Sequence, residues 1–211
     1  MPPDFRAELI GGVVFVPSRR VTIHHGHAHA CLAGWLGDYR VNTPGVESLI
    51  SVTVLLGDDS EPQPDLCHLV DWDCGGQTRD VDGYLAGPPE LILEVATSTA
   101  AIDLHAKRRD YERWGVQEYL VFVPLDQRLM WFVRRRGRFE AMLPGPDGIY
   151  RSRVFPGLWL DPEALFRSDG AALRATVDLG AASPEHQRFV RRLAVRRAGA
   201  AGQKEPAGPN E

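Results

Sequence analysis

The chain contains almost no lysine: 22 of its 24 Lys and Arg residues are arginines, and the two lysines are Lys107 and Lys204. Cysteine is scarce too. Cys31, Cys67 and Cys74 are odd in number and form no CxxC pair, so we expect buried or free thiols rather than disulfides or a structural zinc site. No apolar run approaches the length of a membrane span, and the N-terminus lacks the basic and apolar regions of a signal peptide. We therefore expect a cytoplasmic globular protein without a membrane partner.

Several catalytic and cofactor motifs are also missing. GxGxxG, the P-loop, GxSxG and HExxH do not occur, which leaves the common dinucleotide, NTPase, hydrolase and zincin signatures unrepresented. A histidine cluster could supply two zinc ligands at helical i,i+4 spacing, but no third ligand is marked. The cluster consists of His24, His25, His27 and His29. We favour its interpretation as a helix start near an active cleft, with zinc as the weaker alternative.

Charge is divided unevenly along the chain. Residues 1–127 carry 9 Lys/Arg against 19 Asp/Glu, whereas residues 128–197 carry 14 against 7. An acidic half could hold metal ions and a basic half could meet phosphates. The alternative is that the charges only solvate the two surfaces.

The clearest local pattern is a strand, a helix and a strand over residues 91–123. The helix is expected over 99–114, with Ser98 or Thr99 as its N-cap and Gly115 in the left-handed position after its last turn. A helix of this length can connect two parallel strands, so we predict a βαβ unit. Because such strands are covered on both faces, an ionised Glu94 inside one costs several kcal/mol unless a cation or strong donors meet it.

The remaining elements define the fold class. The predicted core order is helix 25–39, strands 46–56, 65–70 and 91–96, helix 99–114 and strand 116–123. This α-β-β-β-α-β order indicates an α+β fold bordering on α/β, with a mixed β-sheet flanked by helices. Outside it we expect an N-terminal β-hairpin at 8–16, a polar loop or small hairpin at 71–88, a hairpin at 129–143, an edge strand at 150–155, a helix starting at Asp161-Pro162, and a basic helix at 184–197.

Two carboxylates lie on neighbouring predicted strands. Asp65 opens its strand after Pro64, and Glu94 lies in the C-terminal part of the next. Paired carboxylates aimed at one point make an oxygen-rich site suited to Mg²⁺ or Mn²⁺. Taken alone, Asp65 is more readily explained as a turn residue, since Pro-Asp before a strand usually is one, and Glu94 is the stronger candidate because its neighbours are apolar.

Lys107 is the third candidate. Counted back from the connecting loop, it lies roughly 12 Å down the helix and Glu94 roughly 7 Å down the strand, a difference that a lysine stem can cover. The alternative is an i,i+4 pair with Asp103 on a solvated helix face. Because the chain keeps so few lysines, we favour a functional role for this one.

These motifs together resemble a known family. They are Ala-Glu-Leu-Ile-Gly-Gly near the start, His-Gly-x-x-His at 25–29, Pro64-Asp65, Pro-Glu-Leu-Ile-Leu-Glu-Val, and Asp-x-x-x-Lys-x-x-x-Tyr-x-x-x-Gly-Val-x-Glu-Tyr ending at 119. The ordered set is similar to the Uma-two family within the PD-(D/E)XK nuclease superfamily. The resemblance covers roughly residues 6–165, and its most specific block runs from 88 to 119.

The resemblance implies a restriction-endonuclease-like core and divalent-metal-dependent cleavage of nucleic acid. It assigns the metal-ligand roles to Asp65 and Glu94. The superfamily lysine would stand at position 96, where this chain has Ala96, so Lys107 inherits that role by inference. Glu8 and His29 are peripheral candidates. No DNA-recognition domain is visible, and the sequence therefore does not support restriction as a role.

We accordingly expect a Mg²⁺- or Mn²⁺-dependent endonuclease acting on nucleic acid, DNA in the first place. The alternative is a catalytically inactive module of the same fold that binds nucleic acid or protein. Monomer and homodimer both stay open. We expect the nuclease domain at 1–170, a helical extension at 171–197 and a disordered tail at 198–211.

Overall fold

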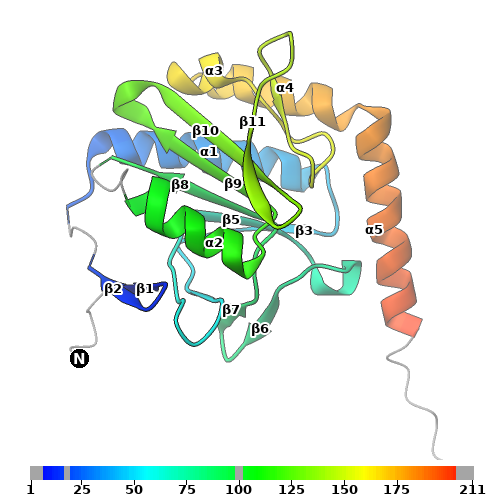
Figure 1. Cartoon of the computed structure of the whole chain (residues 1–211). Helices are drawn as coiled ribbons and strands as arrows, with labels where there is room; N and C mark the ends of the chain where they lie inside the picture. The colour runs from blue at the N-terminus through cyan, green and yellow to red at the C-terminus, as the bar shows by residue number, and fades with distance from the viewer. Residues whose placement is uncertain (1–6, 17–19, 98–101, 203–211) are drawn as a thin grey trace, which may run out of the picture.

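The computed structural model describes residues 7–16, 20–97 and 102–202, and its centre is a six-stranded mixed sheet (Figure 1). The strand order is β11-β10-β9-β8-β5-β3. The strands are β3 (Val46–Ile50), β5 (Leu66–Val70), β8 (Leu91–Val95), β9 (Glu118–Val123), β10 (Arg128–Arg135) and β11 (Arg138–Met142). Only β8 and β9 pair in parallel within this sheet.

The parallel pair at the sheet centre confirms the predicted βαβ unit. Every residue of β8 and β9 is buried, as their near-continuous apolar sequences require of strands covered on both faces. The connection contains a π-helical segment, η2 (Ile102–Lys107), followed by α2 (Arg108–Trp114). Gly115 ends α2 with a φ of 97°, the left-handed conformation that glycine adopts without steric cost. The proposed caps Ser98 and Thr99 lie outside the described residues.

Helices cover the two faces of the sheet as separate layers (Figure 1). One layer contains α1 (Ile23–Val41), α3 (Pro162–Phe166) and α4 (Gly170–Ala181), and α5 (Pro184–Gly202) stands at the side of the molecule. The other layer contains η2 and α2. Side chains alternate along β8, so Leu91, Leu93 and Val95 join the core under α1, while Ile92 joins the core under α2. By the same alternation Glu94 faces α2.

Three small sheets surround this core. β1 (Glu8–Ile10) and β2 (Val13–Phe15) form the predicted N-terminal hairpin. β6 (Arg79–Val81) and β7 (Tyr84–Ala86) form a hairpin inside the polar segment 71–88, and β4 (Val54–Leu55) adds to it in parallel. β12 (Tyr150–Arg151) pairs with β13 (Trp159–Leu160).

Other predictions need correction. The expected strand 46–56 is divided into β3 and β4, because Ser51 has a φ of 52° and turns the chain. The strand expected at 150–155 is shorter and pairs with β13 instead of extending the main sheet. Helix α5 continues to Gly202 instead of ending at Arg197, as the alanines in this segment favour helix. Part of the tail expected to be disordered is thus helical.

The N-cap of α3 and the state of the cysteines agree with what the sequence predicts. Asp161 caps α3 by accepting hydrogen bonds from the backbone N–H groups of Glu163 and Ala164. The three cysteines are free thiols. Among the described residues, no helix is both long and apolar enough to cross a bilayer.

Candidate active site

Glu94 and Lys107 meet in the space between β8 and the helix that follows it. Lys107 Nζ lies 2.9 Å from Glu94 Oε1, and the hydroxyl of Tyr111 donates to the same oxygen at 3.0 Å. Lys107 and Tyr111 are four positions apart, which brings both side chains to the helix face that packs on the sheet. The lysine side chain therefore covers the distance that the sequence argument required of it.

Two more carboxylates surround the lysine. Glu8, from the N-terminal hairpin, lies 3.1 Å from Lys107 Nζ and also accepts a hydrogen bond from the backbone N–H of Gln63 at 2.7 Å. Asp103 Oδ1 lies 3.7 Å from the same nitrogen. The i,i+4 pair with Asp103 thus exists, but on a buried surface, where Lys107 is only 7% exposed.

Asp65 lies across the sheet from Glu94. Strands β5 and β8 are antiparallel with Leu66 opposite Leu93, and one more step in this register opposes Asp65 to Glu94. Asp65 itself precedes β5: its side chain contacts His25 of α1 and the backbone N–H of Val95, and its charge adds to the raised pKa of Glu94. The Asp65 side chain is 21% exposed and that of Glu94 only 5%, so the site is reached from the Asp65 side.

Two histidines of α1 hold Asp65 in place. His25 Nε2 lies 3.4 Å from Asp65 Oδ1, and His25 Nδ1 lies 3.0 Å from the carbonyl of Val95. His29, stacked on His25, lies with its Nε2 3.1 Å from the backbone carbonyl of Asp65. The backbone N–H of Val95 donates to Asp65 Oδ2 at 2.7 Å. The histidine cluster therefore lies at the site, with both rings directed at Asp65.

The electrostatics of the site follow from burial and from its surplus of carboxylates. Burial raises the pKa of Glu94 well above its ordinary value; Lys107 opposes this shift, and Asp103, Asp65 and Glu8 add to it. Burial alone would lower the pKa of Lys107, but the carboxylates of Glu94, Glu8 and Asp103 outweigh it and raise that pKa. Lys107 accordingly stays an ammonium group at neutral pH.

The pKa of Asp65 is shifted in the opposite direction from that of Glu94. Burial raises its pKa, but hydrogen bonds from His25 and from the Val95 N–H outweigh this and leave the pKa below its ordinary value. The pKa of His25 is raised in turn, first by its hydrogen bond to Asp65 and against the effect of burial. Asp65 is therefore ionised over the physiological pH range.

Comparison with known proteins shows the family of the chain. The model of the Uma2 family, described as "Putative restriction endonuclease", matches residues 1–163. The chain belongs to the Uma2 family. A crystal structure of a putative nuclease belonging to DUF820 from Anabaena variabilis ATCC 29413 has a similar fold, with a TM-score of 0.61, 14% sequence identity, and coverage of 77% of this chain and 90% of that one. No curated protein matches the chain.

The donor set of this Uma2 protein fits a divalent cation. Both hydrogen bonds to Glu94 go to Oε1, and among the described residues none goes to Oε2. The carboxylates of Glu8, Asp65, Glu94 and Asp103 outnumber the single ammonium of Lys107, which leaves negative charge for a cation to balance. Oxygen-rich donors of this kind suit Mg²⁺ and Mn²⁺ rather than zinc.

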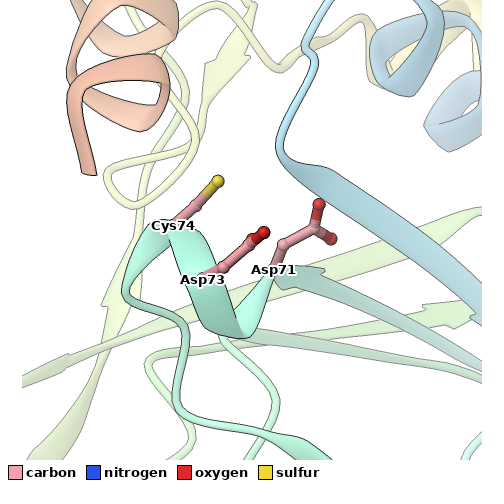
Figure 2. Close-up of side chains that lie close together, drawn as sticks. All are labelled: Asp71, Asp73 and Cys74. Atoms are coloured by element: carbon pink, nitrogen blue, oxygen red, sulfur yellow. The ribbon is translucent and has the colours of Figure 1, made fainter. Parts of the chain in front are cut away.

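Among the described residues, the one group of three His, Cys, Asp or Glu side chains with ligand atoms this close together lies away from the site of Glu94. Asp71, Asp73 and Cys74 bring ligand atoms within 4.8 Å of one another at the start of the segment that leads to β6 (Figure 2). Arg197 from α5 forms an ion pair with Asp71, and its Nε lies 3.5 Å from Asp73 Oδ2. Burial raises the pKa of the Cys74 thiol. This acidic group is the docking point of α5.

Sequence reasoning gave some residues of the site no role of their own. His25 was considered as a zinc ligand, and Tyr111 appeared only as part of a motif. Their signal was spacing: Asp103, Lys107 and Tyr111 are four residues apart, as are His25 and His29, so each set shares one helix face. The spacing did not show which groups each helix face contacts.

Proposed function

We propose that this Uma2 protein is a divalent-metal-dependent endonuclease that hydrolyses phosphodiester bonds of nucleic acid, with DNA as the substrate. Asp65 and Glu94 are the proposed ligands of Mg²⁺ or Mn²⁺, and Lys107 is the proposed third catalytic residue. The observation that carries this proposal is the 2.9 Å contact between Lys107 Nζ and Glu94 Oε1, beside Oε2 of Glu94, to which no described residue donates a hydrogen bond. When bound, the ion would supply Lewis-acid polarisation of a phosphoryl oxygen and would lower the pKa of water.

Lys107 supplies a fixed positive charge in this proposal. Its raised pKa excludes a role as a general base at neutral pH, because it would not release its proton. An ammonium beside the reacting phosphate stabilises the negative charge that develops in the transition state, and more strongly in a buried site than in water. Contacts with Glu8 and Asp103 hold it ready, so we assign positioning roles to these two carboxylates.

Neighbouring residues orient the side chains of the proposed metal ligands. Tyr111 and Lys107 both donate to Oε1 of Glu94, so among the described residues Oε2 keeps no hydrogen-bond donor and is the proposed metal-binding oxygen. His25 and the Val95 N–H contact one oxygen each of Asp65 and keep it ionised. Outer contacts of this kind fix the geometry of ligand side chains and increase metal affinity.

The test is incubation of the purified protein with supercoiled plasmid, single-stranded DNA and RNA, each in Mg²⁺, in Mn²⁺ and in EDTA. We expect nicked and linear plasmid with either metal and intact plasmid in EDTA. Cleavage in EDTA would contradict the metal dependence. Cleavage of RNA alone would overturn the choice of DNA, and binding without cleavage in any metal would favour the inactive-module alternative.

A further inference from the structure

A polar hollow lies on the exposed side of the helix that carries Lys107. Its volume is about 370 Å³, and its walls are η2 and α2 on one side and β11 on the other. The lining residues are Leu104, His105, Arg108, Arg109, Glu112, Arg138 and Phe139. Helix residues of this α2–β11 hollow recur at i and i+4, on a face turned away from the one that bears the buried Lys107.

Arg108 and Arg109 stand out because nothing in the described part of the chain neutralises them. Other arginines have evident structural partners: Arg113 pairs with Asp59 and Asp110, and Arg151 pairs with Asp147. For Arg108 and Arg109, no hydrogen bond or ion pair to another described residue is formed. The hollow therefore contains positive charge that intramolecular contacts do not use.

Arg108 is also held in a defined position. Its guanidinium carbon lies over the ring of Phe132, 4.4 Å from the ring centre. A cation–π contact of this kind holds the guanidinium over the ring, while its N–H groups make no hydrogen bond to a described residue. A planar donor edge of fixed orientation matches the two oxygens of a phosphate.

The one carboxylate in the hollow is already engaged. Glu112 accepts a hydrogen bond from the backbone N–H of Phe139, and its Oε1 lies 3.6 Å from Arg138 Nη1. The backbone carbonyl of Glu112 accepts from Arg134 Nε at 3.0 Å. Glu112 thus connects the β10–β11 hairpin to α2. Because Arg138 offsets the charge of Glu112, Arg108 and Arg109 make the net charge of the hollow positive.

We propose that the α2–β11 hollow binds a phosphate of the nucleic-acid backbone away from the bond that is cut. This inference rests on the proposed function, because a nuclease substrate supplies the backbone phosphates that Arg108 and Arg109 in the hollow suit. The hairpin turn extends the positive surface with the exposed Arg135 and Arg136. A backbone fits this extended surface better than a small phosphorylated molecule, which would need a deeper enclosure.

The experiment measures binding separately from cleavage. Fluorescence anisotropy of a labelled DNA duplex in EDTA gives the Kd at several salt concentrations for the whole chain. Arg108→Met keeps most of the apolar contact with Phe132, and Arg109→Met alters an exposed side chain. The matched control is Arg174→Met on α4, an exposed arginine 3.9 Å from Asp178. Thermal melting verifies that each variant is folded.

We expect Arg108→Met to raise the Kd about tenfold, the effect of losing one bidentate contact, and to reduce the slope of log Kd against log salt by about one. Arg109→Met should raise the Kd severalfold and Arg174→Met should leave it unchanged. Equal affinities of the Arg108 and Arg109 variants and the wild type would overturn the proposal. So would tight binding of inorganic phosphate or a mononucleotide without binding of the duplex.

Failure of this inference is distinguishable from failure of the proposed function. If the protein cuts DNA in Mg²⁺ but Arg108→Met leaves the KM unchanged, the hollow is not a phosphate site and the nuclease assignment stands. If the protein binds DNA through Arg108 but does not cut it in any metal, the hollow stands and the nuclease assignment fails.

Discussion

Lys107 carries a full charge into a site where it is only 7% exposed, and its surroundings explain why this is tolerated. Three carboxylates lie within ion-pairing distance of its nitrogen. Burying a charge costs several kcal/mol unless paired groups and hydrogen bonds offset it. Removing the charge must therefore affect both the stability of the site and its chemistry, and a test has to separate the two.

Replacing Lys107 by Met keeps most of the stem and leaves a helix-compatible residue. We expect cleavage to fall about a hundredfold or more, the scale of losing one oriented charge at a transition state. Lys107→Arg keeps the charge but not the shape, so it should not restore full activity. Single-turnover cleavage of plasmid checks both, with the melting temperature as the folding control. Full activity in Lys107→Met would leave Asp65 and Glu94 as the whole catalytic site.

His68 on β5 gives a prediction about pH and stability. It is fully buried, its Nδ1 lies 2.9 Å from Ser48 Oγ, and burial lowers its pKa to about 3. Between that value and its ordinary pKa of about 6.5, the unfolded chain binds the proton and the folded chain does not, so stability decreases as pH falls through this range. The contribution of His68 should therefore decrease by about 2 kcal/mol from pH 7 to pH 5.

The measurement is the free energy of unfolding in urea at pH 7 and pH 5, for the wild type and for His68→Gln. The variant cannot titrate, so it should lose about 2 kcal/mol less than the wild type over the same interval. Identical losses in the two proteins would mean that His68 is not the group responsible.

At the residue scale, sequence pointed most clearly to the charged groups that burial makes unusual. Glu94 was singled out because its neighbours along the strand are apolar, and Lys107 because lysine is rare in this chain. Asp65 looked like a turn residue, since its partners come from α1 and β8. The role of Glu8 in contacting Lys107 joins residues 99 positions apart, and no local pattern encodes such a contact.

At the scale of elements, features specified by the local sequence were predicted, whereas features that depend on long-range pairing were missed. The βαβ unit, the hairpin β10–β11 and the start of α3 were predicted, because periodicity, turn residues and caps specify them locally. The division between β3 and β4 was missed, because non-glycine residues seldom adopt the positive φ seen at Ser51. The pairing of β12 with β13 depends on tertiary packing, which alternation does not reveal.

The contact between α4 and the loop before β13 gives a prediction at this scale. A Cβ added to Gly180 would lie 2.1 Å from the backbone carbonyl oxygen of Gly157, whereas one added to Gly170 in the same helix would meet open space. Gly180→Ala should therefore displace α4 from its packing against the loop that contains Gly157 and destabilise the protein by about 1–3 kcal/mol. Thermal unfolding should show a Tm lower by about 2–4 °C for each kcal/mol.

Gly170→Ala is the matched control, and its Tm should stay within a degree or two of the wild type, since only helix propensity changes. Equal melting temperatures for the two variants would show that α4 has room to move and that its approach to Gly157 is not tight.

At the scale of the whole molecule, the surplus of arginine after residue 127 is divided between two uses. Arg151 and Arg197 pair with acidic groups of the chain and hold elements together. The turn of the β10–β11 hairpin and α5 present others to solvent. The exposed set consists of Arg135, Arg136, Arg138, Arg188, Arg191, Arg192 and Arg196, of which Arg135, Arg138 and Arg188 also form ion pairs with nearby glutamates. This distribution matches the charge asymmetry of the sequence and suits contact with a polyanion.

Binding of nucleic acid through these arginines should depend steeply on salt, because each neutralised phosphate releases a counterion. With about six or more such contacts, affinity should fall by about a thousandfold between 50 and 200 mM salt. Anisotropy titrations in EDTA provide the measurement. A Kd that barely changes over this range would mean that the arginines only solvate the surface.

The most direct test of the account compares two aspartates of the same chain. Asp65→Asn removes a proposed metal ligand, whereas Asp71→Asn alters the acidic group that docks α5. The measurement is the initial rate of plasmid cleavage in Mg²⁺, with melting temperatures showing that both variants are folded. We predict a loss of about a hundredfold or more for Asp65→Asn and a rate within a few-fold of the wild type for Asp71→Asn. Retained cleavage in Asp65→Asn, or its loss in Asp71→Asn alone, would contradict the account.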